Sequence, residues 1–138
     1  ERLAYTDVAL ALDIHGDAGL AYSLYGVFDR TPDLQGVGFW IDALDIGTAA
    51  DVVAQGFIGS AEFVAEFGVS LTNEQYVEDL YQTFLDRTPD AQGFDYWVSN
   101  VQSGVMDDAD VLVGFATSAE YQALITQDIA NGVLYNVW

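Results

Sequence analysis

The feature that most constrains the fold is an internal duplication. The motif Asp-Arg-Thr-Pro-Asp occupies residues 29–33 and recurs at residues 86–90, a shift of 57. A Leu-Tyr pair precedes both copies, and a Trp, a Gly-Phe pair and a Ser-Ala-Glu triplet follow both in the same order. Two copies are too few for a solenoid, so we expect a pseudo-symmetric pair within a single domain, residues 1–138. The pseudo-repeats cover residues 20–67 and 76–124, and the flanking segments are residues 1–19 and 125–138.

Each copy has the pattern of several short helices. Leu24 and Phe28 share one helical stripe. The Thr-Pro-Asp triplet predicts a helix start with Thr31 as the N-cap residue, and we expect the helix that follows to bury Phe39. Residues 72–75 have the spacing of a capping box, which predicts a further start. The predicted fold class is therefore mainly α, built as two pseudo-repeats of a short multi-helix unit.

The two ends of the chain have a different period. Val8, Leu10 and Leu12 alternate with small or polar residues, and so do Val133 and Tyr135 near the other end. Alternation with a period of two is typical of a strand. We expect these ends to pair as a small two-stranded terminal sheet, and the alternative is a frayed N-terminal helix with a loose tail.

The balance of charge excludes several classes of partner. The chain has 22 Asp and Glu, three Arg and no Lys, which gives a formal net charge of -19. Binding to a nucleic-acid backbone or to an anionic membrane surface needs clustered basic residues, so neither is expected. No apolar run is long enough for a spanning helix, so we expect no membrane insertion. There is no Cys, which excludes disulfides and thiolate chemistry.

The same acidity suggests a setting. A surface that repels itself is stabilised when counterions gather, so salt or divalent cations should stabilise the fold. A solubility device for a saline or extracellular environment is one reading, and calcium bound at carboxylate clusters is the other. An acidic chain without Cys or Lys fits a secreted or cell-surface location.

The order of the duplicated motifs resembles domain-of-unknown-function family 4214. The resemblance extends upstream through residues 12–19 and downstream to residues 129–132, so it covers nearly the whole chain. It implies a helical module of large bacterial secreted and surface proteins, often beside RTX-type calcium-binding nonapeptide repeats. It implies no established activity and no catalytic residues. His15 and Ser23 depart from the family pattern, and this chain has no nonapeptide repeat.

Two arginines occupy equivalent places in the repeat. Arg30 and Arg87 each lie between an Asp and a Thr. We expect each guanidinium to join helices by bonding Asp carboxylates or helix-end carbonyls. Recognition of a carboxylated sugar is the alternative, because Arg suits planar bidentate contacts. The residues assigned to this structural motif are Asp29, Arg30, Asp33, Asp86, Arg87 and Asp90.

Three acidic clusters are candidate calcium sites. The alternating oxygens in residues 29–33 and 86–90 resemble the first ligands of a calcium loop, but the Gly and Glu that an EF-hand needs later are missing. The turn of residues 13–17 has two carboxylates around His15, and the alternative is a turn in which Asp17 caps the next helix. The third cluster lies in residues 107–110 and marks another helix start, where helix capping is the alternative role of these carboxylates. The candidate metal ligands are Asp13, Asp17, Asp107, Asp108 and Asp110.

Trp40 and Trp97 occupy equivalent positions on apolar helix faces. We expect them to pack in the core, and stacking against a sugar is the alternative. Trp138 follows an apolar tail and is expected to pack back or to contact a neighbour.

No pattern predicts catalysis. His15 is the single His, no Ser lies in a nucleophile motif, and zinc-ligand and phosphate-loop patterns are missing. The sequence therefore predicts a non-catalytic extracellular interaction module. Its expected partner is another protein or a second copy of the chain, and calcium is the candidate cofactor. The alternative is a carbohydrate-binding module whose aromatic and carboxylate side chains bind a polysaccharide.

Overall fold

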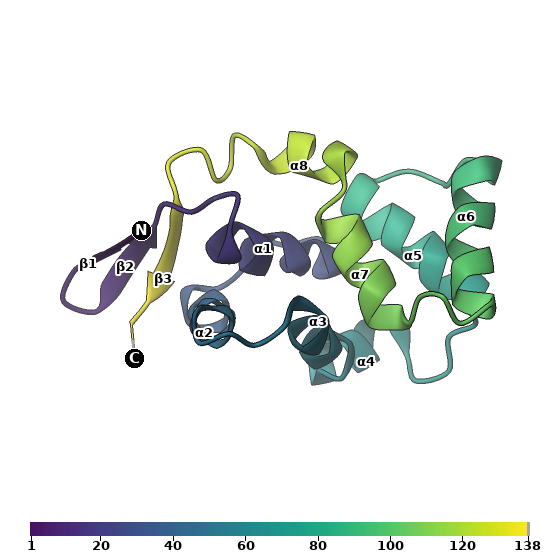
Figure 1. Ribbon diagram of the computed structural model, residues 1–138, viewed down its shortest axis with the longest axis horizontal. Helices are drawn as coiled ribbons and strands as arrows, with labels where there is room; N and C mark the ends of the chain where they lie inside the picture. The colour runs from purple at the N-terminus through teal and green to yellow at the C-terminus, as the bar shows by residue number, and fades with distance from the viewer. Residues whose placement is uncertain (138) are drawn as a thin grey trace.

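A computed structural model describes residues 1–137 and shows a mainly helical molecule with a small sheet at one end (Figure 1). This confirms the predicted fold class. The prediction for Trp138 lies outside the described residues. The strands are β1 (Arg2–Ala4), β2 (Val8–Ala11) and β3 (Val133–Asn136). The helices are α1 (Asp17–Leu24), the 3-10 helix η1 (Tyr25–Phe28), α2 (Leu34–Asp45), α3 (Ala50–Ile58), α4 (Ala61–Phe67), α5 (Asn73–Leu85), α6 (Ala91–Gln102), α7 (Asp108–Ala116) and α8 (Ala119–Ile125).

The predicted pairing of the two ends is confirmed, and a third strand joins it. The sheet is antiparallel with the order β1-β2-β3, so β2 lies between the other two strands. Leu3 pairs with Leu10, and Leu10 pairs with Leu134, so three leucines form one row across the sheet. The extra strand arises because the chain turns back after residue 4 and forms a hairpin with β2.

The small residues of β2, and not its large apolar residues, form the inner face. Ala9 and Ala11 are buried, whereas Leu12, beyond the end of the strand, is exposed. The reason is close packing, since α2 lies directly against β3. A Cβ on Gly38 of α2 would come within 2.7 Å of the main-chain oxygen of Asn136. Small side chains on the inner face permit this approach.

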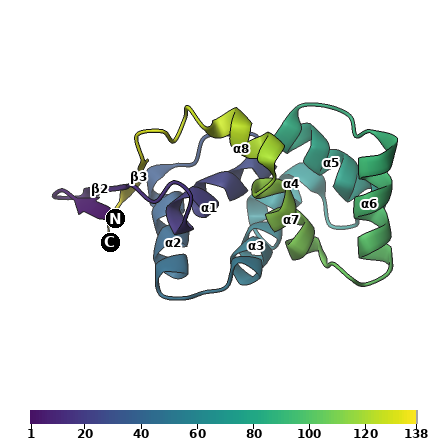
Figure 2. The same ribbon diagram turned by 45° about the horizontal axis from the view of Figure 1, so that its top comes forward.

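The two repeats pack against each other through equivalent helices. The first repeat contains α1, η1, α2, α3 and α4, and the second contains α5, α6, α7 and α8. Helix α3 lies against its counterpart α7 (Figure 2). The 3-10 helix η1 lies against α5. The helix before the motif is unbroken in the second repeat, while the first repeat divides it into α1 and η1.

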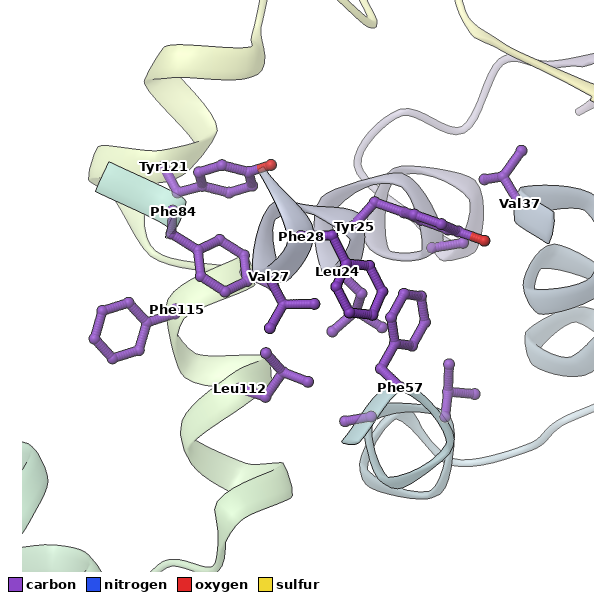
Figure 3. Close-up of a cluster of buried hydrophobic side chains, with 14 of the residues drawn as sticks. Leu24, Tyr25, Val27, Phe28, Val37, Phe57, Phe84, Leu112, Phe115 and Tyr121 are labelled. Carbon is purple, nitrogen blue, oxygen red and sulfur yellow. The ribbon is translucent and has the colours of Figure 1, made fainter. Parts of the chain in front are cut away.

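Aromatic residues form much of the joint core. Phe57 and Phe115 are both buried at equivalent positions. Tyr25 meets Phe57 edge-on with ring centres 4.9 Å apart, and Tyr81 meets Phe115 in the same way at 5.0 Å. Figure 3 shows the first of these contacts beside the side chains that α5, α7 and α8 contribute. The core is therefore continuous across the two repeats.

The predicted helix start at residues 72–75 is confirmed, and two further helices begin at a serine cap. The capping box of Thr72 and Gln75 is formed at the start of α5. Ser60 accepts a hydrogen bond from the N–H of Phe63 and caps α4, and Ser118 caps α8 in the same way. No helix within residues 1–137 is long and apolar enough to cross a membrane.

Two predictions for α2 are wrong. The N-cap residue of α2 is Asp33 and not Thr31, because the Asp33 carboxylate accepts the N–H of Gly36 at 2.6 Å. Phe39 is 54% exposed and not buried, because the inner face of α2 is formed by its neighbours in the helical period. These residues are Val37, Gly38, Ile41 and Leu44.

Candidate functional site

The Asp-Arg-Thr-Pro-Asp motif forms the same turn in both repeats. Asp29 follows η1 and Asp86 follows α5, and both have φ 49 and ψ 42. Within residues 1–137 they are the two residues other than Gly with positive φ. Asp tolerates this left-handed conformation better than most residues, because its short side chain bonds locally. The side chain of Asp86, for example, accepts a hydrogen bond from Gln82 at 3.0 Å.

Each motif arginine forms a two-pronged contact with a glutamate of the same repeat. Arg30 donates from Nε and Nη2 to the two carboxylate oxygens of Glu62, at 2.7 and 2.8 Å. Arg87 donates in the same way to Glu120, at 2.9 and 3.0 Å. Each arginine also donates to the main-chain oxygen of the residue after it. The two contacts, named here the Arg–Glu forks, tie each turn to α4 or α8.

The surroundings of the forks are also repeated. The guanidinium of Arg30 lies over the ring of Tyr25, 5.1 Å from its centre, and Arg87 lies over Tyr81 at 5.0 Å. Hydrogen bonding from Arg30 holds the pKa of the Glu62 carboxyl below its ordinary value. The corresponding bonds raise the pKa of Arg87. The predicted Asp carboxylates are present as longer ion pairs, with Arg30 Nη1 3.8 Å from Asp33 and Arg87 Nη1 3.6 Å from Asp90. The sequence prediction missed the two glutamates, which make the closer contacts.

The last Asp of each motif caps the following helix. Asp33 starts α2, and Asp90 starts α6 by accepting the N–H of Gly93 at 3.0 Å. That backbone hydrogen bond is the main cause of the lowered pKa of the Asp90 carboxyl. A Cβ on Gly36 or Gly93 would overlap a tyrosine hydroxyl of its own repeat. The motif therefore joins a turn, a cap and a close helix contact.

The two tryptophans lie between core and surface. Trp40 is half-buried and stacks on Phe57 with ring centres 5.0 Å apart. Trp97 packs on Phe115 at 4.9 Å. A Cβ on Gly114 would come within 2.7 Å of the Trp97 ring, so small residues in α3 and α7 make room for the indoles. One face of each indole is thus used for packing, and more exposed aromatic side chains lie beside them, namely Phe39 and Tyr96.

The turn before α1 is held by a residue that the sequence did not single out. Arg2 bonds the carboxylate of Asp13 and also that of Asp45, the latter at 2.6 Å. The other oxygen of Asp13 accepts the N–H of Ala18 at 3.2 Å. The predicted capping role of Asp17 is wrong, because Asp17 lies in the first turn of α1 and has no side-chain capping bond. Arg2 thereby links β1 to α2 and to the turn.

The third acidic cluster is a helix start. Asp107 and Asp110 form a capping box at the beginning of α7. The main-chain oxygen of Asp108 accepts the hydroxyl of Tyr76 at 2.7 Å. Burial, with a smaller effect of Asp107, raises the pKa of the Asp108 carboxyl. Within residues 1–137 no three His, Cys, Asp or Glu side chains lie close enough together to hold a metal ion.

Two of the hollows on the surface of the described chain are considered for binding. One is an apolar depression of about 420 Å³ on the outer side of α2, lined by Phe39, Asp42, Ala43 and Ile46, and named here the α2 depression. Ile46 is 85% exposed there. The other is a cavity of about 410 Å³ between the repeats, named here the inter-repeat cavity. Its lining combines Asp29, Asp86 and Asp128 with tyrosine and apolar side chains.

The two turns, their forks and their shared core define a class of protein, a helical module made of two pseudo-symmetric repeats. The chain belongs to the family described as "Domain of unknown function (DUF4214)", whose model matches residues 17–67 and 54–125. The predicted family is therefore confirmed. No curated protein and no solved structure matches the chain.

Proposed function

We propose that this chain is a non-catalytic interaction module of a secreted or cell-surface assembly, and that it binds another protein through the α2 depression. The observation that carries this proposal is the placement of Ile46, which is 85% exposed, beside the exposed ring of Phe39. Large apolar side chains gathered in one exposed hollow are typical of interaction surfaces.

The use of the motif residues supports the same reading. The forks engage Arg30 and Arg87, and the last Asp of each motif caps a helix. Groups that hold the fold together are not free to take part in a reaction. The repeated charges therefore act as scaffold, and binding falls to side chains outside the motif.

Cations enter the proposal as screening ions. A chain with a formal net charge of -19 repels a like-charged partner or a second copy. Salt and calcium screen the repulsion between exposed charges that lie farther apart than about 10 Å at 0.1 M ionic strength. We therefore propose that calcium stabilises the module through its charge and not through a dedicated site.

Photo-crosslinking tests the proposed surface. We place a photoreactive amino acid at Ile46 and, as the control, at the exposed Asp51 of α3, in the chain produced by its source cells. The proposal predicts a protein adduct from position 46 and not from position 51. The mass of the adduct separates a second copy from a different protein. Equal labelling from both positions, or none from either, contradicts the proposed surface.

The carbohydrate-binding alternative has one observation in its favour. Phe39 and Tyr96 are each about half exposed and each lies edge-on to the tryptophan beside it, with ring centres 4.8 and 5.1 Å apart. Exposed aromatic rings are suitable platforms for sugar stacking. A glycan array, probed with calcium and with a chelator, tests this alternative. A defined sugar whose binding is lost in Phe39→Ala and Tyr96→Ala would replace the first proposal.

A further inference from the structure

The small terminal sheet has its large apolar side chains on the outside. Side chains that pair across antiparallel strands lie on the same face of the sheet. The row of Leu3, Leu10 and Leu134 therefore lies opposite the face that contains the buried Ala9. Leu3 is 39% exposed and Leu134 is 47% exposed. An antiparallel sheet with one face in water commonly has polar residues on that face, so this sheet reverses the usual arrangement.

The apolar surface extends beyond this row on both sides. The N–H of Leu12 donates to the main-chain oxygen of Glu1 at 2.8 Å, and the N–H of Tyr5 donates to that of Val8 at 2.7 Å. The pairing thus continues past both ends of β1, and alternation along the strands places further apolar residues beside the row. We name this surface the leucine face, and its members are Leu3, Tyr5, Val8, Leu10, Leu12 and Leu134.

Gly132 makes the leucine face continuous. A Cβ on this residue would come within 2.9 Å of a methyl carbon of Leu10, so the leucine side chain lies across the space that a larger residue would fill. Gly132 also has φ +104, a conformation that favours glycine. The leucine face is therefore a connected apolar surface, of the kind that marks interaction sites.

The leucine face has almost none of the charge of the chain. The charged residues among residues 1–12 are Glu1, Arg2 and Asp7, and residues 129–137 contain none. Two chains that each carry a net charge of -19 repel each other wherever their acidic faces meet. The sheet lies at one end of the long axis of the molecule (Figure 1). A second copy that docks at this end does not have to bring the helices of the two second repeats together.

We propose that the leucine face packs against the same face of a second copy of this chain, so that the two sheets form a sandwich about a two-fold axis. The two faces match in charge, since an uncharged apolar face is complementary to itself. A basic partner gains nothing here, because the members of the leucine face carry no carboxylate. The surface is separate from the α2 depression, to which the proposed function assigns another protein.

The size of the leucine face sets the strength of the dimer. Stable interfaces use about 20–30 residues a side, which is far more than this face offers. We therefore expect a weak dimer, with a dissociation constant on the order of 100 µM to 1 mM. Added salt should strengthen it, because screening reduces the repulsion between the two acidic chains. A contact held by opposite charges would weaken with salt, so the dependence on salt distinguishes the two kinds of partner.

Dilution of the unmodified chain tests the proposal directly. Backbone ¹⁵N–¹H shifts and sedimentation are followed between about 20 µM and about 2 mM protein. We expect concentration-dependent shifts in β1, β2 and β3, and a dissociation constant that falls about threefold or more between about 0.05 M and about 0.5 M NaCl. In a mixture of ¹³C-labelled and unlabelled chains, we expect nuclear Overhauser effects between the leucine methyls of different copies.

Paired variants make the test specific to the leucine face. Leu3→Thr with Leu134→Thr removes the two exposed leucines of the row and keeps residues that favour strands. Ile46→Thr is the matched control, because it removes an exposed apolar side chain from the α2 depression. We expect the first variant to weaken dimerisation by about tenfold or more, and the control to change it less than about twofold.

Three results would overturn the inference. The first is a chain that stays monomeric at about 2 mM in about 0.5 M NaCl. The second is a set of concentration-dependent shifts that lies outside the sheet. The third is unchanged dimerisation in the Leu3→Thr, Leu134→Thr variant with a native spectrum. A dimer lost only in Ile46→Thr would also overturn it, by placing self-association in the α2 depression. Failure at the leucine face leaves the crosslinking result at Ile46 intact, and the reverse also holds.

Discussion

At the scale of single residues, the repeated motif gives one structural role to its Arg and to each of its two Asp. The first Asp adopts the left-handed turn, the Arg forms the fork, and the last Asp caps the next helix. The same set of roles in both repeats explains why the motif recurs almost unchanged. The residue scale is also where the sequence prediction and the structure differ most.

Substitution of the capping residue distinguishes the observed start of α2 from the predicted one. We expect Asp33→Ala to lower the free energy of unfolding by about 1 kcal/mol, because the N–H of Gly36 loses its acceptor. Thr31→Ala should change it by less than about 0.5 kcal/mol, since the Thr31 side chain does not cap the helix. Urea unfolding of both variants measures the difference. A larger loss from Thr31→Ala would contradict the observed cap.

The close contact between α3 and Trp40 gives a second test. Ala is the better helix former, but a Cβ on Gly56 would overlap the indole ring. We therefore expect Gly56→Ala to destabilise the fold by about 1–3 kcal/mol. Trp40→Phe removes the ring atoms that clash, so adding it should recover part of the loss. Thermal unfolding checks both variants, and a stabilising Gly56→Ala would show that the contact is looser than described.

At the scale of elements, the sequence predicts helices and strands well and their burial less well. The capping box of Thr72 was readable because its signal is local. The exposure of Phe39 and the burial of Ala9 could not be predicted from the sequence, because they depend on which neighbouring elements pack against α2 and β2. The partners of the arginines, Glu62 and Glu120, lie 32 and 33 residues away. Their retention in both Ser-Ala-Glu triplets was the available signal.

The two faces of β2 should respond differently to substitution. Ala11 is 0% exposed, so we expect Ala11→Leu to destabilise the fold by about 1–3 kcal/mol through overpacking. Leu10→Thr, on the outward face of the same strand, should cost about 1 kcal/mol or less. The two free energies of unfolding are compared in urea. The reverse order would mean that the leucine face is the buried one.

At the scale of the whole molecule, two opposing groups of carboxyls set the dependence of stability on pH. Burial raises the pKa of Glu66, Asp79 and Asp108. Hydrogen bonds from arginine lower the pKa of Glu62 and Glu120. The first group favours the folded state when protonated, and the second favours it when ionised.

We therefore expect stability to rise and then fall as the pH is lowered. Protonation of the first group adds stability as the pH falls from 7 through their raised pKa values. The contribution of the Arg–Glu forks is fully present above the unfolded value, about 4.5, and is lost as the pH falls through the folded value. Melting temperatures between about pH 3 and pH 8 should thus pass through a maximum between neutral pH and the folded-state pKa of the two fork glutamates. A monotonic rise with pH would contradict this assignment.

The charge of the whole chain predicts a similar response to sodium and calcium salts. Screening of the net charge of -19 should raise the melting temperature with either salt at equal ionic strength. A further saturable rise with calcium alone, removed by a chelator, would show a dedicated site instead. Scanning calorimetry in matched solutions separates the two.

The most direct measurement of the central claim, that the repeated charged motif is internal scaffold, is a double-mutant cycle on Arg30 and Glu62. Free energies of unfolding are measured for Arg30→Gln, Glu62→Gln and the double variant. For this partly exposed pair we predict a favourable coupling of about 0.5–1 kcal/mol, reduced at high salt. Additive losses, or an Arg30→Gln variant with unchanged stability, would show that the arginine is free for another purpose and would contradict the account.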